Sequence, residues 1–402
     1  MKTLKELYKI GKGPSSSHTM GPERACKYFK EETKDADFYQ VTLYKSLAKT
    51  GHGHGTDRVI LETLAPIETN IIFSENTPSD VTHPNTMDIV AYKDGKEIKR
   101  CRVESIGGGN VNINGEAAFR MPSVYPENSF AEINQFCKWR KLTLVEYVEL
   151  NEGHEIWDFL KDIWKAMKAS INEGLNASGI LPGGLHVDKK AQIIYKSIQE
   201  DDAAEIKELK KVSAYAYAVA EQNADNGTIV TAPTCGASGV LPAVLLYLQE
   251  KYNFSDQRIA EALAVGGIFG NLIRRNASIS GAECGCQAEI GTATSMAAAA
   301  ACELMGYPID EAEYAAEISM EHSLGLTCDP ICGLVQIPCI ERNAVAATRA
   351  LDACRLSHIL VGTRNISFDM IVRTMYETGI NLNQAFRETA EGGLAKYYSR
   401  KK

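Results

Sequence analysis

Residues 13–22, GPSSSHTMGP, place four hydroxyl groups and one histidine between two Gly-Pro pairs. Histidine ordinarily titrates near neutrality, so His18 is suited to general acid or base catalysis. Its expected catalytic neighbours in this polar segment are Ser16, Ser17 and Thr19. The alternative is that the hydroxyls only cap the helix expected to begin near Met20. Capping needs one hydroxyl rather than four, which favours a catalytic function.

A second segment that could do chemistry is TGHGHGT, residues 50–56, in which glycines alternate with His52 and His54. Glycine lets a backbone approach a ligand closely, and histidines can donate hydrogen bonds. We expect a polar wall of an active site here, with His54 as a catalytic residue. A zinc pair is less favoured, because no third ligand is evident nearby. SIGGGN, residues 105–110, is either a third wall of the same site or a bare turn.

Three cysteines stand where loops are expected to meet helices: Cys286, Cys328 and Cys339. Loops let thiolates point at one metal, and a helix N-terminus lowers the pKa of a thiol. Thiolates select iron–sulfur clusters, zinc or copper. The spacing is neither a paired C-x-x-C zinc pattern nor the compact ferredoxin run, and free cysteines are often simply buried. From the residues alone, both metal ligation and the choice of metal stay open.

The composition places these residues in an ordinary globular chain. The chain has 402 residues with 45% hydrophobic and 23% charged, enough for two or three domains. Its net charge of -8 argues against a nucleic-acid partner. No apolar run is long enough to span a membrane, and the start does not resemble a secretory signal. We therefore expect a cytoplasmic protein without membrane contact, whose eleven cysteines are not a disulfide framework.

The elements that must position these residues differ between the two halves. Short β-branched runs before about residue 145 predict strands at 38–44, 70–73, 87–92 and 97–103, with helices at 25–33 and 56–63. Apolar residues at helical spacing then predict helices at 144–175, 203–223, 240–252, 256–275, 288–305, 310–322, 337–353 and 366–378. The predicted fold class is α+β. An N-terminal α/β domain covers residues 1–145, and a C-terminal all-helical catalytic domain covers residues 146–402.

Taken together, the motifs resemble those of the iron–sulfur L-serine dehydratases (L-serine ammonia-lyases) in their single-chain form. The resemblance covers nearly the whole chain and rests on six segments in the same order. They are GPSSSHTMGP at 13–22, LAKTGHGHGT at 47–56, LPGGL at 181–185, APTCGASGVLP at 232–242, GCQAEIG at 285–291 and CDPICGLVQIPCIERN at 328–343.

The resemblance implies that Cys286, Cys328 and Cys339 hold a [4Fe–4S] cluster whose fourth iron is left for substrate. It also implies an N-terminal domain of the allosteric-substrate-binding type, linked in relatives to regulation or to dimer contacts, and we expect a homodimer. The sequence departs from the family after GGLA at 392–395, because no cysteine follows there to cap the open iron. Cys235 is a second departure, since many relatives carry asparagine at that position.

The implied reaction is the deamination of L-serine to pyruvate and ammonia by β-elimination of water. Hydroxide is a poor leaving group, and an iron with an open position can act as a Lewis acid towards it. The aminoacrylate product tautomerises and hydrolyses without further help. No pyridoxal phosphate is required, and no lysine stands in a convincing context for that cofactor.

The substrate carboxylate needs hydrogen-bond donors. Residues 231–239 precede a helix, and a helix N-terminus with free hydroxyls can bind an anion, so Thr234 and Ser238 are expected to bind substrate. The alternative there is a capping and packing turn. Arg342 and Asn343 stand three and four residues after Cys339 and are expected to bind the carboxylate or orient the cluster. Arg342 could instead pair with a surface glutamate.

Two functions from other classes use the same cysteines. A redox or iron sensor would carry the cluster without turnover, and it would leave the hydroxyl-rich segments unexplained. A zinc-dependent lyase or hydrolase would use the three thiolates around a single ion. Visible absorption of anaerobically purified protein separates an iron–sulfur cluster from zinc.

Overall fold

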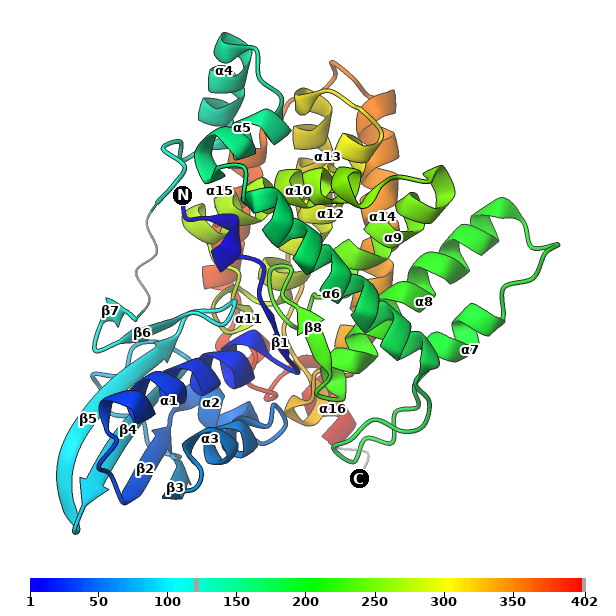
Figure 1. Ribbon diagram of the computed structural model, residues 1–402. Helices are drawn as coiled ribbons and strands as arrows, with labels where there is room; N and C mark the ends of the chain where they lie inside the picture. Colours follow the sequence, from blue (N-terminus) through cyan, green and yellow to red (C-terminus); the bar gives the residue numbers. More distant parts are fainter. Residues whose placement is uncertain (119–122, 400–402) are drawn as a thin grey trace.

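The computed structural model describes residues 1–118 and 123–399. It has a mixed sheet with flanking helices near the N-terminus and a larger helical part after it, which confirms the predicted α+β class (Figure 1). Within the described residues, no helix combines the length and apolar character that crossing a bilayer requires.

The six-stranded sheet has the order β3-β2-β4-β5-β6-β7. Only β2 and β3 are parallel, and the other neighbours run antiparallel. Its strands are β2 Phe38–Leu43, β3 Glu68–Phe73, β4 Thr86–Lys93, β5 Lys96–Ser105, β6 Val111–Ile113 and β7 Glu116–Ala117. Alternate residues of β2 are buried, as expected for a strand with one covered face.

Three helices accompany the sheet: α1 Gly21–Glu32, α2 Lys45–Thr50 and α3 Thr56–Leu64. Helices α1 and α3 pack side by side against it (Figure 1). Between these helices and the strands lies a separate hydrophobic core that includes Phe29, Tyr39 and Ile89. The predicted strands and both predicted helices of this part are present within a few residues.

The helical part contains most of the predicted helices. They are α4 Phe130–Arg140, α5 Leu144–Glu152, α6 Ile156–Asn176, α7 Ala191–Lys196, α8 Ala204–Ala224, α9 Val240–Tyr252, α10 Asp256–Asn276, α11 Gly281–Cys284, α12 Thr292–Leu304, α13 Ile309–Glu321, α14 Cys339–Ile359, α15 Phe368–Asn381 and α16 Gly393–Ser399. The single helix predicted over residues 144–175 is wrong: the chain breaks at Gly153, whose φ of 81° ends α5. That left-handed conformation is available to glycine at little cost.

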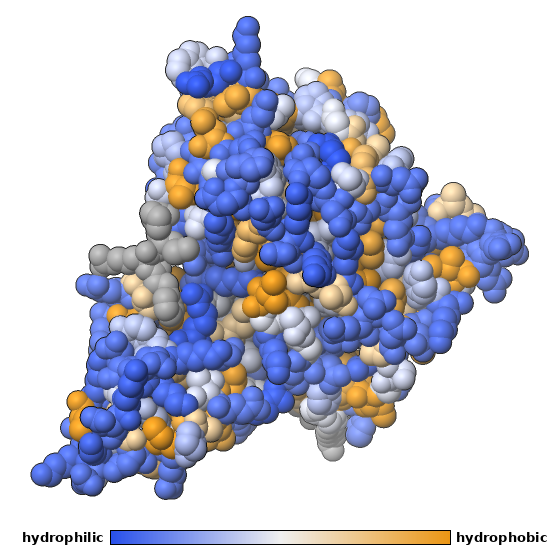
Figure 2. Space-filling model, in the orientation of Figure 1, coloured by the Kyte–Doolittle hydropathy of each residue, from blue (hydrophilic) through white to orange (hydrophobic). Residues whose placement is uncertain are grey.

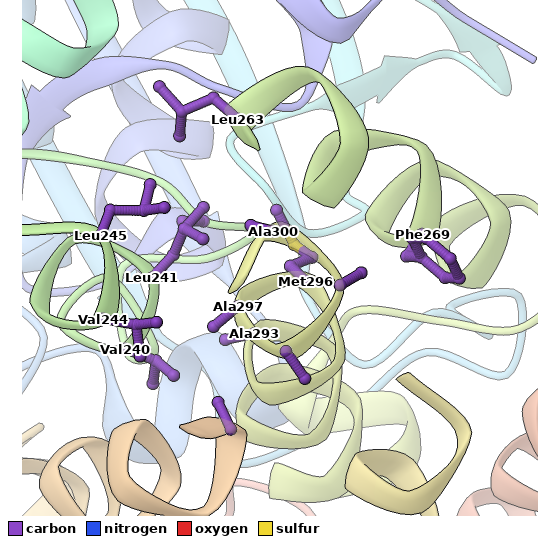
Figure 3. Close-up of a cluster of buried hydrophobic side chains, with 14 of the residues drawn as sticks. Val240, Leu241, Val244, Leu245, Leu263, Phe269, Ala293, Met296, Ala297 and Ala300 are labelled. Atoms are coloured by element: carbon purple, nitrogen blue, oxygen red, sulfur yellow. The ribbon is translucent and has the colours of Figure 1, made fainter. Parts of the chain in front are cut away.

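Helix α12 lies at the centre of the helical part, where α9, α10, α13 and α14 contact it. Its small side chains face neighbouring helices: Figure 3 shows Ala293, Ala297 and Ala300 near Val240, Leu241 and Leu263. Alanine lets helix axes approach closely, which explains the predicted role of the run AAAAA at 297–301 as a packed interior helix.

The first twenty residues pack with the helical part. Strand β1 Ile10–Lys12 pairs antiparallel with β8 Thr228–Val230, so Ile10 lies opposite Val230. Leu4 and Tyr8 are buried in the helical core, and the Tyr8 hydroxyl donates to Leu263 O at 2.8 Å. The N-terminal segment therefore links both parts before the chain enters α1. The boundary at residue 145 stays a prediction.

The face of the molecule drawn in Figure 2 is mainly hydrophilic, and its hydrophobic residues form small, separate groups. Scattered apolar residues of this kind are normal on a protein surface. The expected homodimer stays a prediction.

Candidate active site

The predicted catalytic segments meet along one seam between the two parts, called here the domain seam. One side of it consists of residues 13–22, 46–56 and 105–110. The other side consists of residues 231–239, 278–291, 328–343 and 385–390. Two glycines approach each other closely across it: a Cβ added to Gly53 would lie 2.6 Å from Gly333 O. The glycines of TGHGHGT therefore bring the histidine loop against the cysteine-bearing segment.

His18 is held by hydroxyls on both ring nitrogens. Ser17 Oγ lies 2.9 Å from Nδ1, and Ser46 Oγ lies 3.1 Å from Nε2. Because Ser46 donates its proton to Glu388 O at 2.8 Å, it must accept from His18 Nε2–H, and Nδ1 accepts from Ser17. Ser15 Oγ accepts from His18 N at 3.1 Å, so the capping alternative holds for one hydroxyl. Two further hydroxyls bind the histidines: Ser17 Oγ contacts His18 Nδ1, and Thr19 Oγ1 donates to His54 O.

His54 differs from His18 in having a free lone pair. Its Nδ1 lies 3.1 Å from Thr50 O, and since a carbonyl only accepts, Nδ1 carries the proton. Nε2 is fully buried and has no hydrogen-bond partner among the described residues. Burial lowers the pKa of His54 to about 4, so the ring is neutral at neutral pH. Thr19 Oγ1 donates to His54 O at 2.8 Å and holds the loop in place.

Glu388, which the sequence analysis did not name, completes a compact group with both histidines. Its Oε1 lies 3.5 Å from His18 Nδ1 and 3.7 Å from His54 Nε2. Burial, with Glu289 nearby, raises the pKa of Glu388 well above its ordinary value. Its backbone is fixed, because Glu388 N donates to Cys328 O at 2.7 Å. Glu388 therefore connects the histidines to one of the predicted cluster ligands.

The three predicted ligand cysteines all lie at the ends of short segments facing one another. Cys286 precedes the helical turn Gln287–Gly291, and Cys339 is the first residue of α14. Cys328 forms an isolated parallel β-bridge with Arg387. Cys286 and Cys328 are buried, and Cys339 is half-buried. Cys286 and Cys339 lie close enough to Cys328 to add to the effect of burial in raising the pKa of its thiol, and Cys286 does the same for Cys339.

The two neighbouring cysteines are placed differently. Cys284 is buried against α15, where a Cβ added to Gly379 would lie 2.7 Å from its sulfur. Cys332 is exposed, in a loop with a φ of 54°. The predicted choice of Cys286, Cys328 and Cys339 over Cys284 and Cys332 thus has a geometric basis and stays a prediction.

The donor set suits a multinuclear cluster better than one ion. Within residues 1–118 and 123–399, the group whose metal-binding atoms all lie within 4.8 Å of one another is His18, His54 and Glu388, and the three thiols do not form such a group. A single zinc ion needs its sulfurs closer, because each Zn–S bond is only about 2.3 Å. Thiolates are soft ligands and are the donors that iron–sulfur clusters take.

Arg342 lies among the thiols and not at the surface. It donates to Thr327 O at 2.6 Å and pairs with buried Asp329 at 3.6 Å, so the alternative of a surface glutamate is wrong. Burial raises the pKa of the Cys286 thiol to about 11, and the Arg342 guanidinium opposes that rise. A cation beside thiols favours their thiolate form, which is the form that binds metal.

Asn343 ties α14 to the loop before α9. Its Oδ1 accepts from Gly239 N at 2.9 Å, and its Nδ2 donates to Gly236 O at 2.8 Å. By contrast, Thr234 and Ser238 are buried, and their hydroxyls lack partners among the described residues. Of the four predicted substrate contacts, these two hydroxyls are free to meet a ligand.

Buried polar atoms without a described partner gather along the domain seam. They include His54 Nε2, Ser105 Oγ, Thr234 Oγ1, Ser238 Oγ and Ser280 Oγ. Leaving a buried polar group unpaired is costly, so such a group indicates a place for a polar ligand or water.

A cavity of about 620 Å³ leads towards the domain seam from the surface. Its lining combines Lys45, Ser46 and Lys49 from α2 with Ala282, Arg387 and Thr389 from the helical part. Ser46 bonds Glu388 O, and the Ala282 N–H bonds the Glu388 carboxyl. The cavity therefore reaches residues that contact Glu388, and its lining carries both basic and acidic side chains, among them Lys45, Arg387 and Glu283.

Three residues of the site escaped the sequence analysis: Ser46, Glu289 and Glu388. Glu289 lies inside the motif GCQAEIG, and a Cβ added to Gly281 would lie 2.9 Å from its Oε2. Glu388 comes four residues before GGLA. A charged residue within or beside a glycine-rich segment was the available signal for both glutamates. Ser46 gave none, since it occupies an ordinary helical position.

Comparison with known proteins matches this chain to two family models. Residues 3–72 match the serine dehydratase beta chain, and residues 66–395 match the serine dehydratase alpha chain. The chain is 36% identical to an L-serine dehydratase of Streptomyces coelicolor, over 97% of both proteins. It is 35% identical to L-serine dehydratase 1 of Escherichia coli, over 98% of this chain and 99% of that protein. It is also 35% identical to an L-serine dehydratase of Helicobacter pylori, over 98% of each.

These matches cover almost the whole chain and span the segments that meet at the domain seam. Both family models match within one polypeptide, which confirms the expected single-chain form. The chain belongs to the serine dehydratase family.

Proposed function

We propose that this chain is an L-serine ammonia-lyase, which eliminates water from L-serine to give aminoacrylate and then pyruvate and ammonia. Family membership and the names of the relatives support the substrate. The arrangement of the domain seam supports the chemistry, because a proton acceptor, unpartnered hydroxyls and neighbouring thiols lie along it. The observation that carries the proposal most directly is the free, buried lone pair of His54 Nε2.

Cys286, Cys328 and Cys339 would hold a [4Fe–4S] cluster, with Arg342 and Asp329 fixing the surrounding backbone. When bound, the cluster supplies a Lewis-acidic iron for the β-hydroxyl of serine. The proposed cofactor set contains no pyridoxal phosphate.

His54 is the proposed acceptor of the Cα proton. A general base needs an unprotonated, unpartnered lone pair at the working pH, and His54 Nε2 has one because the proton is on Nδ1, which is bound to Thr50 O. His18 is less suited to this role, since hydroxyls occupy both of its nitrogens. The proposed role of His18 is to hold Ser17 and Ser46 in place and to face the same carboxyl of Glu388.

Glu388 would accept a hydrogen bond from the imidazolium that forms when His54 takes the proton. Its Oε1 lies 3.7 Å from His54 Nε2, within reach once the ring becomes a donor. Thr234 and Ser238 remain proposed substrate contacts, because their hydroxyls are buried and unpartnered in the described structure. The contacts of Asn343 and Arg342 support positioning roles for them around the substrate and the thiols.

Anaerobic purification, iron and sulfide analysis and an assay of pyruvate release from L-serine test this proposal together. The expected result is pyruvate formation by a protein with the visible absorption of an iron–sulfur cluster. A cluster without turnover would favour the sensor function, and zinc in place of iron would favour a zinc-dependent lyase or hydrolase.

The ligand assignment has a matched control in the chain. Cys286→Ser, Cys328→Ser and Cys339→Ser should each lose iron and activity, because each removes a thiolate from the proposed set. Cys284→Ser and Cys332→Ser should keep both. Loss of iron in Cys284→Ser with retention in Cys286→Ser would contradict the assignment.

A further inference from the structure

The loop between β5 and β6 forms a tight turn of three glycines. Asn110 N donates to Gly107 O at 3.0 Å, which closes the turn. Gly108 and Gly109 have φ values of 57° and 70°, and positive values at both central positions are typical of a type I′ turn. Residues with a side chain rarely adopt this backbone conformation, which explains why glycines occupy these positions.

The position of this turn is unusual for a hairpin, because residues 107–110 are all buried. In an exposed turn, the N–H groups of the two central residues bind water. Here the N–H groups of Gly108 and Gly109 have no hydrogen-bond partner among the described residues. Buried backbone N–H groups are almost always paired, so two adjacent unpaired ones indicate a place for a polar ligand or water.

Two cations hold the turn from one side. Lys9 Nζ donates to Gly108 O at 3.0 Å, and Arg24 Nη1 donates to Gly109 O at 2.8 Å. Lys9 also donates to the side chain of Asn110. A trans peptide points its C=O and the following N–H in opposite directions. The bond between Lys9 and Gly108 O therefore turns Gly109 N–H away from Lys9.

The opposite side of the turn faces the domain seam. A Cβ added to Gly107 would lie 3.5 Å from Ser280 Cβ, and one added to Gly108 would lie 3.5 Å from Pro233 O. Ser280 is 2% exposed, and its hydroxyl is buried without a partner in the described chain. The next residue, Gly281, packs against Cys328, because a Cβ there would lie 3.0 Å from its sulfur. The turn, Ser280 and the proposed cluster ligands thus follow one another along the same wall.

We infer that the Gly107–Gly109 turn and Ser280 form the subsite for the carboxylate of the amino-acid substrate, and that Lys9 and Arg24 are positioning residues that fix this turn. The inference rests on the proposed function for the identity of the substrate. Two N–H groups and one hydroxyl match the acceptors of a carboxylate, as in other anion sites made of successive backbone amides. Lys9 on Gly108 O also polarises that peptide and strengthens donation from Gly109 N–H. Arg24 on Gly109 O acts on the next peptide, whose Asn110 N–H closes the turn.

The charges around the turn suit an anion. Basic side chains gather behind it, namely Lys9, Arg24 and Arg274, and Glu6 Oε2 lies 3.5 Å from Lys9 Nζ. Basic side chains beside the turn favour a carboxylate over an ammonium group there. The substrate amine would then lie farther along the domain seam, and the β-hydroxyl would point to the thiols.

Binding of L-alanine and L-alaninamide to the anaerobically prepared protein tests the inference without turnover, since neither compound has a leaving group at Cβ. Calorimetry should show that wild type prefers L-alanine, whose carboxylate the amide lacks. Lys9→Met and Arg24→Met should each weaken L-alanine binding by roughly tenfold or more, because a charge-assisted hydrogen bond that fixes the subsite is lost. Arg24→Lys should restore part of the affinity.

Lys27→Met is the matched control, because Lys27 is exposed on α1 and pairs only locally with Glu23. If Lys9→Met fails to fold, the affinity of Arg24→Met for L-alanine tests the inference. The inference is overturned if wild type binds both compounds equally or does not bind L-alanine. It is also overturned if Lys9→Met and Arg24→Met keep the wild-type preference for L-alanine. Lys9-dependent binding in a protein without L-serine turnover would uphold the subsite and reject the proposed function.

Discussion

His18 and His54 lie side by side, with 4.4 Å between ring centroids, yet their hydrogen bonds give them different chemistry. Only His54 keeps an unpartnered nitrogen in the described structure. His54→Asn should therefore lower kcat by roughly 10²–10⁴-fold with unchanged iron content, as expected for loss of a general base. His52→Asn is the matched control from the same loop, since His52 is exposed and stacks on Phe73. Near-normal turnover in His54→Asn would assign the proton transfer elsewhere.

The same burial predicts a pH dependence of stability. The pKa of His54 falls from 6.5 to about 4 on folding, so between these values the unfolded chain binds a proton that the folded chain does not. Stability should therefore fall as the pH drops below about 6.5, and the groups facing the ring are His18 and Glu388. Between about pH 7 and pH 5 the loss due to His54 is about 2 kcal/mol.

Denaturant unfolding of wild type and His54→Gln at both pH values measures this difference. Wild type should lose more of its free energy of unfolding on acidification than the variant does. Equal losses in the two proteins would show that His54 is not the group responsible.

At the scale of residues, site residues that stand together in motifs could be identified from the sequence, and isolated ones could not. His18, His54 and the three cysteines stand in glycine- or proline-punctuated segments, and this local pattern marks them in the sequence itself. Glu388 reaches the histidines because the segment around Arg387 pairs with Cys328, a contact between distant positions that no local pattern encodes. Arg342 lies near the thiols, as its place after Cys339 predicts, but its partner Asp329 depends on the path of the loop.

At the scale of elements, glycine sets how closely loops approach, and Gly53 provides a test. Gly53→Ala would place a methyl group 2.6 Å from Gly333 O, which is backbone and cannot rotate away. The loop should shift, with a cost of about 1–3 kcal/mol in stability and a fall in kcat of up to roughly 100-fold through displaced His54. Glu62→Ala is the control, because the Glu62 side chain is exposed on the same helix α3 that follows the loop. Unchanged kcat in Gly53→Ala would show that the loop contact does not position His54.

Periodicity located most elements, because an amphipathic helix or half-buried strand repeats its pattern locally. The boundaries of α9 and nearly those of α8 and α10 follow directly from it. It failed where one glycine decides the geometry, as at Gly153, and where a partner is distant, as in the pairing of β1 with β8. Three-residue strands carry too little pattern to be recognised without their partners.

At the scale of the whole molecule, two hydrophobic cores share one chain, and the N-terminal segment belongs to the larger. Tyr8 is buried in the helical core, and Tyr39 is buried in the core of the sheet. Tyr8→Ala should lower the free energy of unfolding by roughly 3–5 kcal/mol, as expected when a large buried side chain is removed. Tyr39→Ala is the matched variant in the other core.

Hydrogen exchange distinguishes the two cores, because local opening follows contiguous packing units. In Tyr8→Ala, protection should fall first in α10, whose Leu263 carbonyl accepts from Tyr8, while β2 and β4 keep theirs. Tyr39→Ala should produce the reverse pattern, since its side chain lies under the sheet. If Tyr8→Ala loosens β2 and β4 as much as α10, the two cores unfold as one unit, and the domain seam is then as stable as either core rather than a boundary between them.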